Sequence, residues 1–189
     1  METFVSRRFV LLDRDGTINV EAGYVLRPEE VRLIPGAGAA IRKLRDLGLG
    51  IVVVTNQAPI ARGWITEDEL TTIHARLREL LAAEGADVDA IEHCPHDRDD
   101  GCACRKPGTE MAERAAARLG FDPTEGFVVG DHAGDMGLGR AIGARTVLVR
   151  TGHGEEELEA AAPLADHVVA DLGEAADVIA DEILAGVDP

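Results

Sequence analysis

Phe9-Val-Leu-Leu-Asp-Arg-Asp-Gly-Thr17 is the stretch that decides the fold of this chain. Its four apolar residues are too few for a buried helix and rich in strand formers, so they predict a central parallel strand. Asp13 and Asp15 follow at the carboxyl end of that strand, where open α/β sheets bind ligands. Two carboxylates this close repel each other, and a divalent cation relieves the repulsion. Mg²⁺ suits a site of this kind when the substrate is a phosphate. A strand that ends in a merely acidic turn is the alternative interpretation.

Length, composition and charge narrow the class of protein. The chain has 189 residues, which suits one domain over residues 1–189. Its formal net charge of −16 argues against non-specific nucleic-acid binding, which needs a basic face. No apolar run reaches membrane-spanning length, and the N-terminal residues lack the apolar region of a signal peptide. We therefore expect a monomeric cytoplasmic protein without a nucleic-acid or membrane partner.

The rest of the chain alternates short apolar runs with helical patterns. The predicted strands after the first are 50–55, 90–93, 126–130, 144–149 and 167–169. Helices are predicted from about 36 to 47, 66 to 84, 109 to 119 and 172 to 184, with others after 131 and 154. This alternation predicts a doubly wound, mostly parallel α/β sheet without a separate cap domain. In the 66–84 helix, His74 falls one position off the apolar face, so we expect it at the surface.

Polar residues follow several of these strands. Thr55, Asn56 and Gln57 end the second strand and can donate hydrogen bonds to a phosphate, and the loop after them carries one cation, Arg62. The fourth strand ends in Asp131-His-Ala-Gly-Asp135, whose two acids are four residues apart and can share one site. Asn19 can donate to a sugar hydroxyl, although most loop asparagines satisfy only local backbone groups.

Three cysteines and one histidine lie within eleven residues, and we call residues 94–104 the cysteine loop. Cys94, His96, Cys102 and Cys104 match the four soft ligands that a structural Zn²⁺ prefers. His93 is a less favoured ligand than His96 because it ends a predicted strand, and chance clustering of reduced cysteines is the alternative. Arg105 and Lys106 follow at once, so a metal in the loop would fix two cations. The chain has only one other lysine, which indicates that a compact charge is wanted at 106.

Taken in chain order, these motifs resemble the series found in the haloacid dehalogenase-like phosphohydrolases. Five segments carry a closer similarity, namely Asp13-Arg-Asp-Gly-Thr-Ile-Asn19, Thr55-Asn-Gln57, Ala61-Arg-Gly63, Cys94-Pro-His96 and Cys102-Ala-Cys-Arg-Lys-Pro107. They are similar to the D-glycero-D-manno-heptose 1,7-bisphosphate 7-phosphatase family, and the histidinol-phosphate phosphatase family shares the cysteine loop. The sequence departs from the heptose family at Ala58-Pro59, where that family usually has Ser-Gly.

The resemblance implies roles for individual residues. Asp13 is the nucleophile that forms an aspartyl-phosphate, and Asp15 is the general acid and base. Mg²⁺ is held by Asp13, the backbone carbonyl of Asp15 and Asp131, while Thr55 and Lys106 stabilise the transferring phosphoryl group. Asp135 orients a metal-bound water or Lys106. The residues expected to contact substrate are Asn19, Asn56, Gln57, Arg62, Arg105 and His132.

The function implied is removal of the 7-phosphate from heptose 1,7-bisphosphate, with Mg²⁺ as catalytic cofactor, structural Zn²⁺ and a small sugar phosphate as partner. A phosphatase for histidinol phosphate or another small sugar phosphate is the first alternative. A catalytically dead module that holds a phosphorylated ligand is opposed by the presence of both Asp13 and Asp15. A zinc-dependent nucleic-acid module is opposed by the net charge of −16.

Overall fold

The computed structural model describes residues 7–186 and contains one six-stranded sheet. All strand pairs are parallel, in the order β3-β2-β1-β4-β5-β6. The strands are β1 (Phe9–Leu12), β2 (Gly50–Asn56), β3 (Ala90–Cys94), β4 (Phe127–Gly130), β5 (Arg145–Val149) and β6 (His167–Val169). The prediction of a doubly wound, mostly parallel sheet is confirmed. Residues 1–6, where the expectation of no signal peptide chiefly applies, lie outside the described part.

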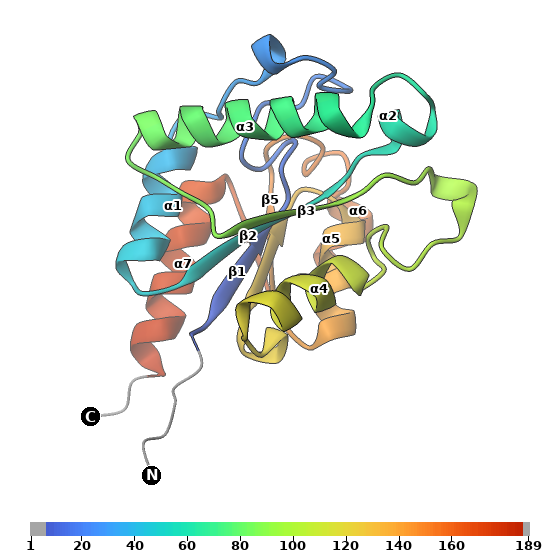
Figure 1. Cartoon of the computed structure of the whole chain (residues 1–189). Helices are drawn as coiled ribbons and strands as arrows, with labels where there is room; N and C mark the ends of the chain where they lie inside the picture. Colours follow the sequence, from blue (N-terminus) through green and yellow to red (C-terminus); the bar gives the residue numbers. More distant parts are fainter. Residues whose placement is uncertain (1–6, 187–189) are drawn as a thin grey trace.

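Helices cover both faces of the sheet. Figure 1 shows α1 (Ala37–Asp46) and α7 (Leu172–Ala185) on one side, with α4 (Glu110–Leu119) and α5 (Ala133–Ile142) on the other. The long α3 (Glu67–Ala83) packs on the same core as α1 and α7. Two four-residue helices complete the set, α2 (Ala58–Ala61) and α6 (Leu158–Ala161). The acidic helix predicted after residue 154 is therefore short, and a 3-10 turn over Ala162–Leu164 continues it.

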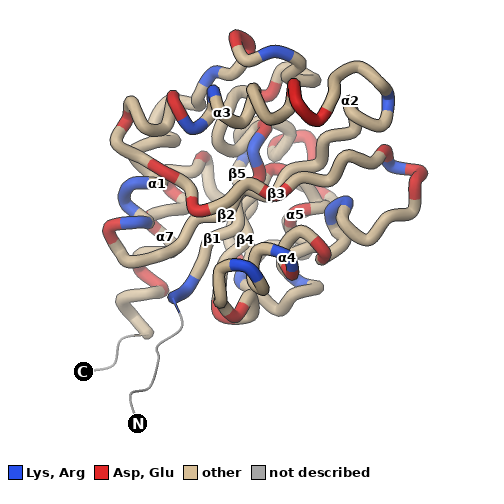
Figure 2. Tube along the Cα trace, in the orientation of Figure 1, with Lys and Arg blue, Asp and Glu red and all other residues tan. Residues whose placement is uncertain are grey.

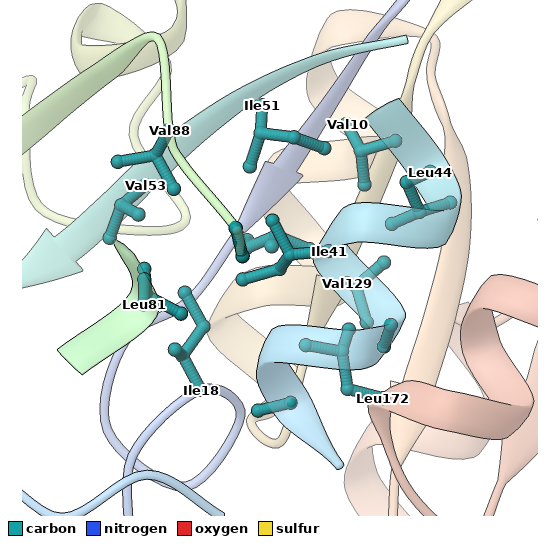
Figure 3. Packing of buried hydrophobic residues seen from close by; sticks show 14 of the residues in the cluster. Val10, Ile18, Ile41, Leu44, Ile51, Val53, Leu81, Val88, Val129 and Leu172 are labelled. Carbon is teal, nitrogen blue, oxygen red and sulfur yellow. The ribbon is translucent and has the colours of Figure 1, made fainter. Parts of the chain in front are cut away.

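The strands supply alternate side chains to the two cores, because successive residues of a strand point to opposite faces. Val10 and Leu12 pack with Ile41 and Leu44 of α1, as Figure 3 shows in part. Leu11 belongs to the other core, which contains residues of α4 and α5. Both faces of β1 are buried, which explains why its sequence is apolar without alternation.

The central position of β1 decides where the acids of the first motif lie. β1 pairs with β2 on one side and β4 on the other, and the backbone N–H of Asp13 extends the pairing by donating to Val129 O at 2.9 Å. The loop that follows is anchored by Ile18, which is fully buried in the larger core and labelled in Figure 3. The site residues on this loop are therefore anchored to the larger of the hydrophobic cores.

Two further observations concern the described chain as a whole. Within residues 7–186, no helix combines the length and the apolar composition needed to cross a membrane. Lys and Arg are interspersed with Asp and Glu along the helices and loops, as Figure 2 shows. A site for an anionic ligand therefore needs its own local group of Lys or Arg side chains.

Candidate active site

The floor of the site lies where β1 and β4 end. Asp13 follows β1, Asp131 follows β4, and both side chains are buried. After Asp13 the chain turns at Gly16, whose φ is +81°, and a Cβ added there would lie 2.1 Å from Asp131 Oδ2. Glycine is therefore required at this position both by backbone conformation and by the close approach of Asp131.

A buried lysine joins the acids at the floor. Lys106 Nζ lies 2.6 Å from Asp13 Oδ1 and 2.6 Å from Asp135 Oδ1, and it donates to Val54 O at 2.8 Å. Burial disfavours the charged form of Lys106, but Asp13 and Asp135 outweigh this effect and raise its pKa. The predicted meeting of Lys106 with the acids of two strands is thus present in the structure.

Three carboxylates face this single ammonium group. Oxygens of Asp13, Asp131 and Asp135 all lie within 4.8 Å of one another, and Asp131 Oδ1 is buried without a hydrogen-bond partner. Burial, together with the neighbouring carboxylates, raises the pKa of Asp13 to about 7 and that of Asp131 to about 9. An excess of buried negative charge with an orphaned oxygen fits a hard divalent cation such as Mg²⁺. That the backbone carbonyl of Asp15 is a ligand of Mg²⁺ stays a prediction.

The side chain of Asp15 is not part of this cluster and is surrounded by donors. Arg14 donates to both carboxylate oxygens through Nε and Nη2, at 2.7–3.1 Å. Asn19 Nδ2 donates to Oδ1 at 2.9 Å, and Gln57 Nε2 donates to Oδ2 at 3.1 Å. Burial alone would raise the pKa of Asp15, but Arg14 and the two amides hold it below its ordinary value.

This arrangement changes the interpretation of two residues. Asn19 was expected to contact substrate, yet it is 1% exposed and its amide is used by Asp15 and by Val20 O. The structure therefore favours a positioning role for Asn19. Arg14, to which the sequence analysis gave no role, is 1% exposed and makes the principal contact with Asp15. Its position between two acids in Asp13-Arg-Asp15 could have indicated in the sequence that it pairs with one of them.

The residues at the end of β2 line the site next to the acids. Thr55 Oγ1 accepts a hydrogen bond from Gln57 Nε2 at 2.8 Å. Asn56 Oδ1 accepts from the backbone N–H of Lys106 at 3.0 Å, so it fixes the lysine's main chain. All three side chains line the cavity described below, as the sequence predicts.

The four predicted zinc ligands gather at one point. Cys104 Sγ lies 2.7 Å from Cys94 Sγ and 3.2 Å from His96 Nδ1, and Cys102 Sγ lies 3.6 Å from both other sulfurs. All four ligand atoms lie within 4.8 Å of one another, which fits a tetrahedral site. His93 is not in the group, since its Nε2 lies 2.8 Å from Glu67 Oε2.

Arg62 is engaged elsewhere than predicted. Its Nε and Nη2 donate to the two carboxylate oxygens of Asp97 at 2.6 and 2.9 Å, and Nη1 donates to the Tyr24 hydroxyl at 2.8 Å. The guanidinium also lies over the rings of Tyr24 and Trp64. Arg62 does not line the cavity. The expected contact with substrate is not supported, and Arg62 instead links the cysteine loop to the loop after β1.

A cavity of about 720 Å³ opens above the floor. Its lining includes Arg98 and Arg105 from the region of the cysteine loop, and Arg105 Nη1 donates to His96 O at 3.2 Å. His132 also lines the cavity, and the centroid of its ring lies 4.9 Å from that of the His153 ring. Arg105 and His132 thus lie where the sequence predicts. Further lining residues that the sequence analysis did not single out are Glu21, Tyr24, Arg98, His153 and Glu157.

Acids at the ends of β1 and β4, a buried lysine and a doubly wound sheet define a hydrolase of the haloacid dehalogenase-like class. A family model described as "HAD-hyrolase-like" matches residues 103–175, which contain Lys106, Asp131 and Asp135. Many solved structures also match the fold.

The closer relatives narrow the class. A D-glycero-beta-D-manno-heptose-1,7-bisphosphate 7-phosphatase of Pseudomonas aeruginosa is 39% identical, over 93% of this chain and 99% of its own. The Chlorobaculum tepidum relative, a D-glycero-D-manno-heptose-1,7-bisphosphate 7-phosphatase, is 41% identical over 90% of this chain and 92% of its own. A D,D-heptose 1,7-bisphosphate phosphatase from B. bronchiseptica, complexed with magnesium and phosphate, superposes with a TM-score of 0.86 at 36% identity. That alignment covers 93% of this chain and 99% of that one. This chain belongs to the heptose-1,7-bisphosphate 7-phosphatase family, which confirms the resemblance seen in the sequence.

Proposed function

We propose that this chain is a Mg²⁺-dependent phosphatase that removes the 7-phosphate of D-glycero-D-manno-heptose 1,7-bisphosphate and leaves heptose 1-phosphate. One observation carries the proposal: Asp13 lies at the floor of a cavity, held by Lys106 and next to Asp131. A carboxylate placed in this way can attack a phosphorus atom bound beside it. Membership of the 7-phosphatase family supplies the substrate.

The cavity suits a small substrate with two anionic ends. Its volume of about 720 Å³ falls in the usual range for small-molecule sites. Lys106 and the end of β2 would receive the phosphate that is cleaved. Arg105 and Arg98, which also line the cavity, would receive the second phosphate, and an arginine fork binds phosphate well.

In the first step, an oxygen of Asp13 forms a bond to the 7-phosphorus while the bond from phosphorus to the sugar oxygen breaks. Asp15 gives its proton to that leaving oxygen. The incoming phosphate brings negative charge close to Asp15, and nearby negative charge raises the pKa of a carboxyl group. When bound, Mg²⁺ supplies positive charge to the phosphoryl oxygens, and Asp13, Asp131 and the Asp15 carbonyl are the groups we propose to hold it.

In the second step, the ionised Asp15 takes a proton from water, which attacks the phosphorus of the aspartyl-phosphate. The bond between Asp13 and phosphorus breaks, and inorganic phosphate leaves with Asp13 restored. Thr55 and Lys106 hold the phosphoryl oxygens in both steps. The donors around Asp15 favour the ionised form that this second step requires.

We also propose that the cysteine loop holds one structural Zn²⁺ through Cys94, His96, Cys102 and Cys104. Four donors leave no open position for a substrate, so the metal would order the loop without taking part in the chemistry. A single domain over residues 1–189, a monomeric state and a cytoplasmic location stay predictions.

Phosphate release from a panel of substrates tests the proposal. The panel contains both anomers of heptose 1,7-bisphosphate, the corresponding monophosphates, histidinol phosphate and common sugar phosphates. We expect the bisphosphate to have the highest kcat/KM, and Asp13→Asn to abolish turnover while Asp46→Asn, which alters a carboxylate outside the cavity, does not. A preference for histidinol phosphate or for a monophosphate would reject the proposed substrate, and near wild-type turnover by Asp13→Asn would reject the proposed nucleophile.

A further inference from the structure

Arg14 connects the acid of the proposed reaction to a helix outside the site. Its Nε and Nη2 face Asp15, with the shortest contact at 2.7 Å. Its third nitrogen, Nη1, lies 3.2 Å from Nε2 of His74 on α3. The guanidinium is 1% exposed, so it cannot exchange these partners for bulk water. The orientation of the guanidinium is therefore fixed by Asp15 on one side and by His74 on the other.

His74 is placed to act as an acceptor. The sequence analysis expected a surface residue, but the structure shows a half-buried side chain that faces Arg14. Burial first, and then the charge of Arg14, lower the pKa of His74 to about 3. A neutral imidazole has one nitrogen that accepts a hydrogen bond, and Arg14 can only donate. Nε2 is therefore the acceptor in this contact.

The neighbouring histidine does not compete for this contact. The His93 ring lies 6.0 Å from that of His74 between centroids, and its Nε2 lies 2.8 Å from Glu67 Oε2. His93 thus has a partner of its own on α3. The chain of contacts that leads to the acid consists of His74, Arg14 and Asp15.

We infer that His74 and Arg14 are positioning residues that hold the carboxylate of Asp15 in the orientation needed for proton transfer. The inference rests on the proposed function, in which Asp15 is the general acid and base. Asn19 and Gln57 each bind only one oxygen of Asp15, whereas Arg14 binds both and so sets the plane of the carboxylate. His74 holds the far side of the guanidinium that sets this plane. Losing a buried hydrogen-bond partner leaves an unsatisfied donor, which favours a different rotamer.

Three variants on α3 separate positioning from general stability. His74→Leu removes the acceptor, and His74→Gln retains a carbonyl oxygen that can accept from Arg14. Arg76→Ala is the matched control, since it removes an exposed ion pair with Glu79 on the same helix. We expect kcat of His74→Leu to fall about tenfold, equivalent to about 1.4 kcal/mol, with KM nearly unchanged. His74→Gln should recover most of this loss.

The leaving group provides the decisive measurement. A sugar alkoxide needs a proton as it leaves, whereas 4-nitrophenolate leaves without one. Release of the alcohol or phenol in a single turnover reports the first step alone. His74→Leu should therefore slow this step for the sugar phosphate about tenfold and for 4-nitrophenyl phosphate less than twofold. An equal loss on both substrates would overturn the inference, because it would place the effect outside proton transfer.

A crystal structure of His74→Leu tests the same inference without activity. We expect the guanidinium of Arg14 to be rotated and the carboxylate plane of Asp15 to be changed. Unchanged positions of both side chains would overturn the inference, even if the rate fell. If His74→Leu does not fold, the same measurements on Arg14→Lys decide, since this variant keeps a cation but cannot contact both Asp15 and His74 at once. Failure of the proposed function would look different, because it would appear without any change at His74, as a wild-type preference for another substrate or as turnover by Asp13→Asn.

Discussion

Removal of Mg²⁺ should make the protein progressively less stable as the pH rises. In the metal-free protein, burial raises the pKa of Asp13 from an ordinary value of 3.8 to about 7 and that of Asp131 to about 9. From about pH 4 up to these raised pKa values, the carboxyl groups of Asp13 and Asp131 keep a proton in the folded protein that they have already lost in the unfolded chain. The free energy of unfolding therefore falls as the pH rises, and the loss for Asp13 is complete only above about pH 7.

The size of the effect follows from the shift. One pKa unit corresponds to about 1.4 kcal/mol, so the shift of Asp13 amounts to at most about 4 kcal/mol of stability at pH 8. The loss for Asp131 likewise begins near pH 4, and it continues to about pH 9. Bound Mg²⁺ favours the ionised carboxylates and removes this penalty. At pH 6 the metal must displace the protons of Asp13 and Asp131, whereas at pH 9 it need not, so the stabilisation produced by Mg²⁺ should be several kcal/mol smaller at pH 6 than at pH 9.

Thermal unfolding followed by circular dichroism measures both quantities. The protein is dialysed into Mg²⁺-free buffer without a chelator, so that any zinc stays bound, and Tm is recorded from pH 6 to pH 9 with and without saturating MgCl₂. The matched control is Asp131→Asn, which keeps the shape of the side chain and removes one charge. Its metal-free form should depend less on pH and respond less to Mg²⁺. A stabilisation by Mg²⁺ that is the same at pH 6 and pH 9 would refute the reasoning.

Three other predictions concern the rim of the cavity and the cysteine loop. Arg105→Ala should lower kcat/KM for the bisphosphate more than for the monophosphate of the same sugar. The difference should correspond to about 1.5–3 kcal/mol, as expected for a lost hydrogen bond to a charged group. An equal loss on both substrates would argue against a role of Arg105 at the second phosphate. Metal analysis of untagged protein should find about one zinc per chain, and Cys102→Ser should lower both zinc content and activity; three freely titrating thiols in the native wild type would contradict this. Arg62→Lys should raise KM more than it lowers kcat, because the residue links the loops at the rim and does not touch the reacting groups; a change in kcat alone would argue against that link.

The fold and the floor of the site could be predicted because local sequence determines them. A short apolar run of strand formers is satisfied as a buried strand, and several such runs end in polar residues that the parallel topology brings to one edge. Asp13 and Asp131 are placed together in this way, whereas Lys106 follows the cysteine loop and its role beside them was implied by the family resemblance. The cysteine loop was equally predictable, since four soft ligands within eleven residues have few other uses.

The partners of individual side chains could not be predicted in this way. Asn19, Arg62 and His74 were each assigned to substrate or solvent, and each is used by another protein side chain. The contact of His74 with Arg14 joins residues 60 positions apart, and that of Arg62 with Asp97 joins residues 35 apart. A helical period shows which face of α3 is apolar, but it does not show that a buried guanidinium reaches that helix from another loop. Long polar side chains have many rotamers, and only the packed structure selects one.

The cysteine loop is fixed at both of its ends, and this decides what it can do. At one end, Cys94 is the last residue of β3, and its carbonyl accepts from the backbone N–H of Gln57 at 2.7 Å. At the other end, the backbone N–H of Lys106 donates to Asn56, and its ammonium group donates to Val54 O. Both attachments are to β2 or to the residue that follows it, so the two ends of the loop are held beside Asp13. Residues inside the loop, such as Asp97 and Arg98, can therefore differ and alter the rim of the cavity while the phosphoryl site stays in place. We therefore propose that selection among substrates and transfer of the phosphoryl group depend on different parts of one short segment.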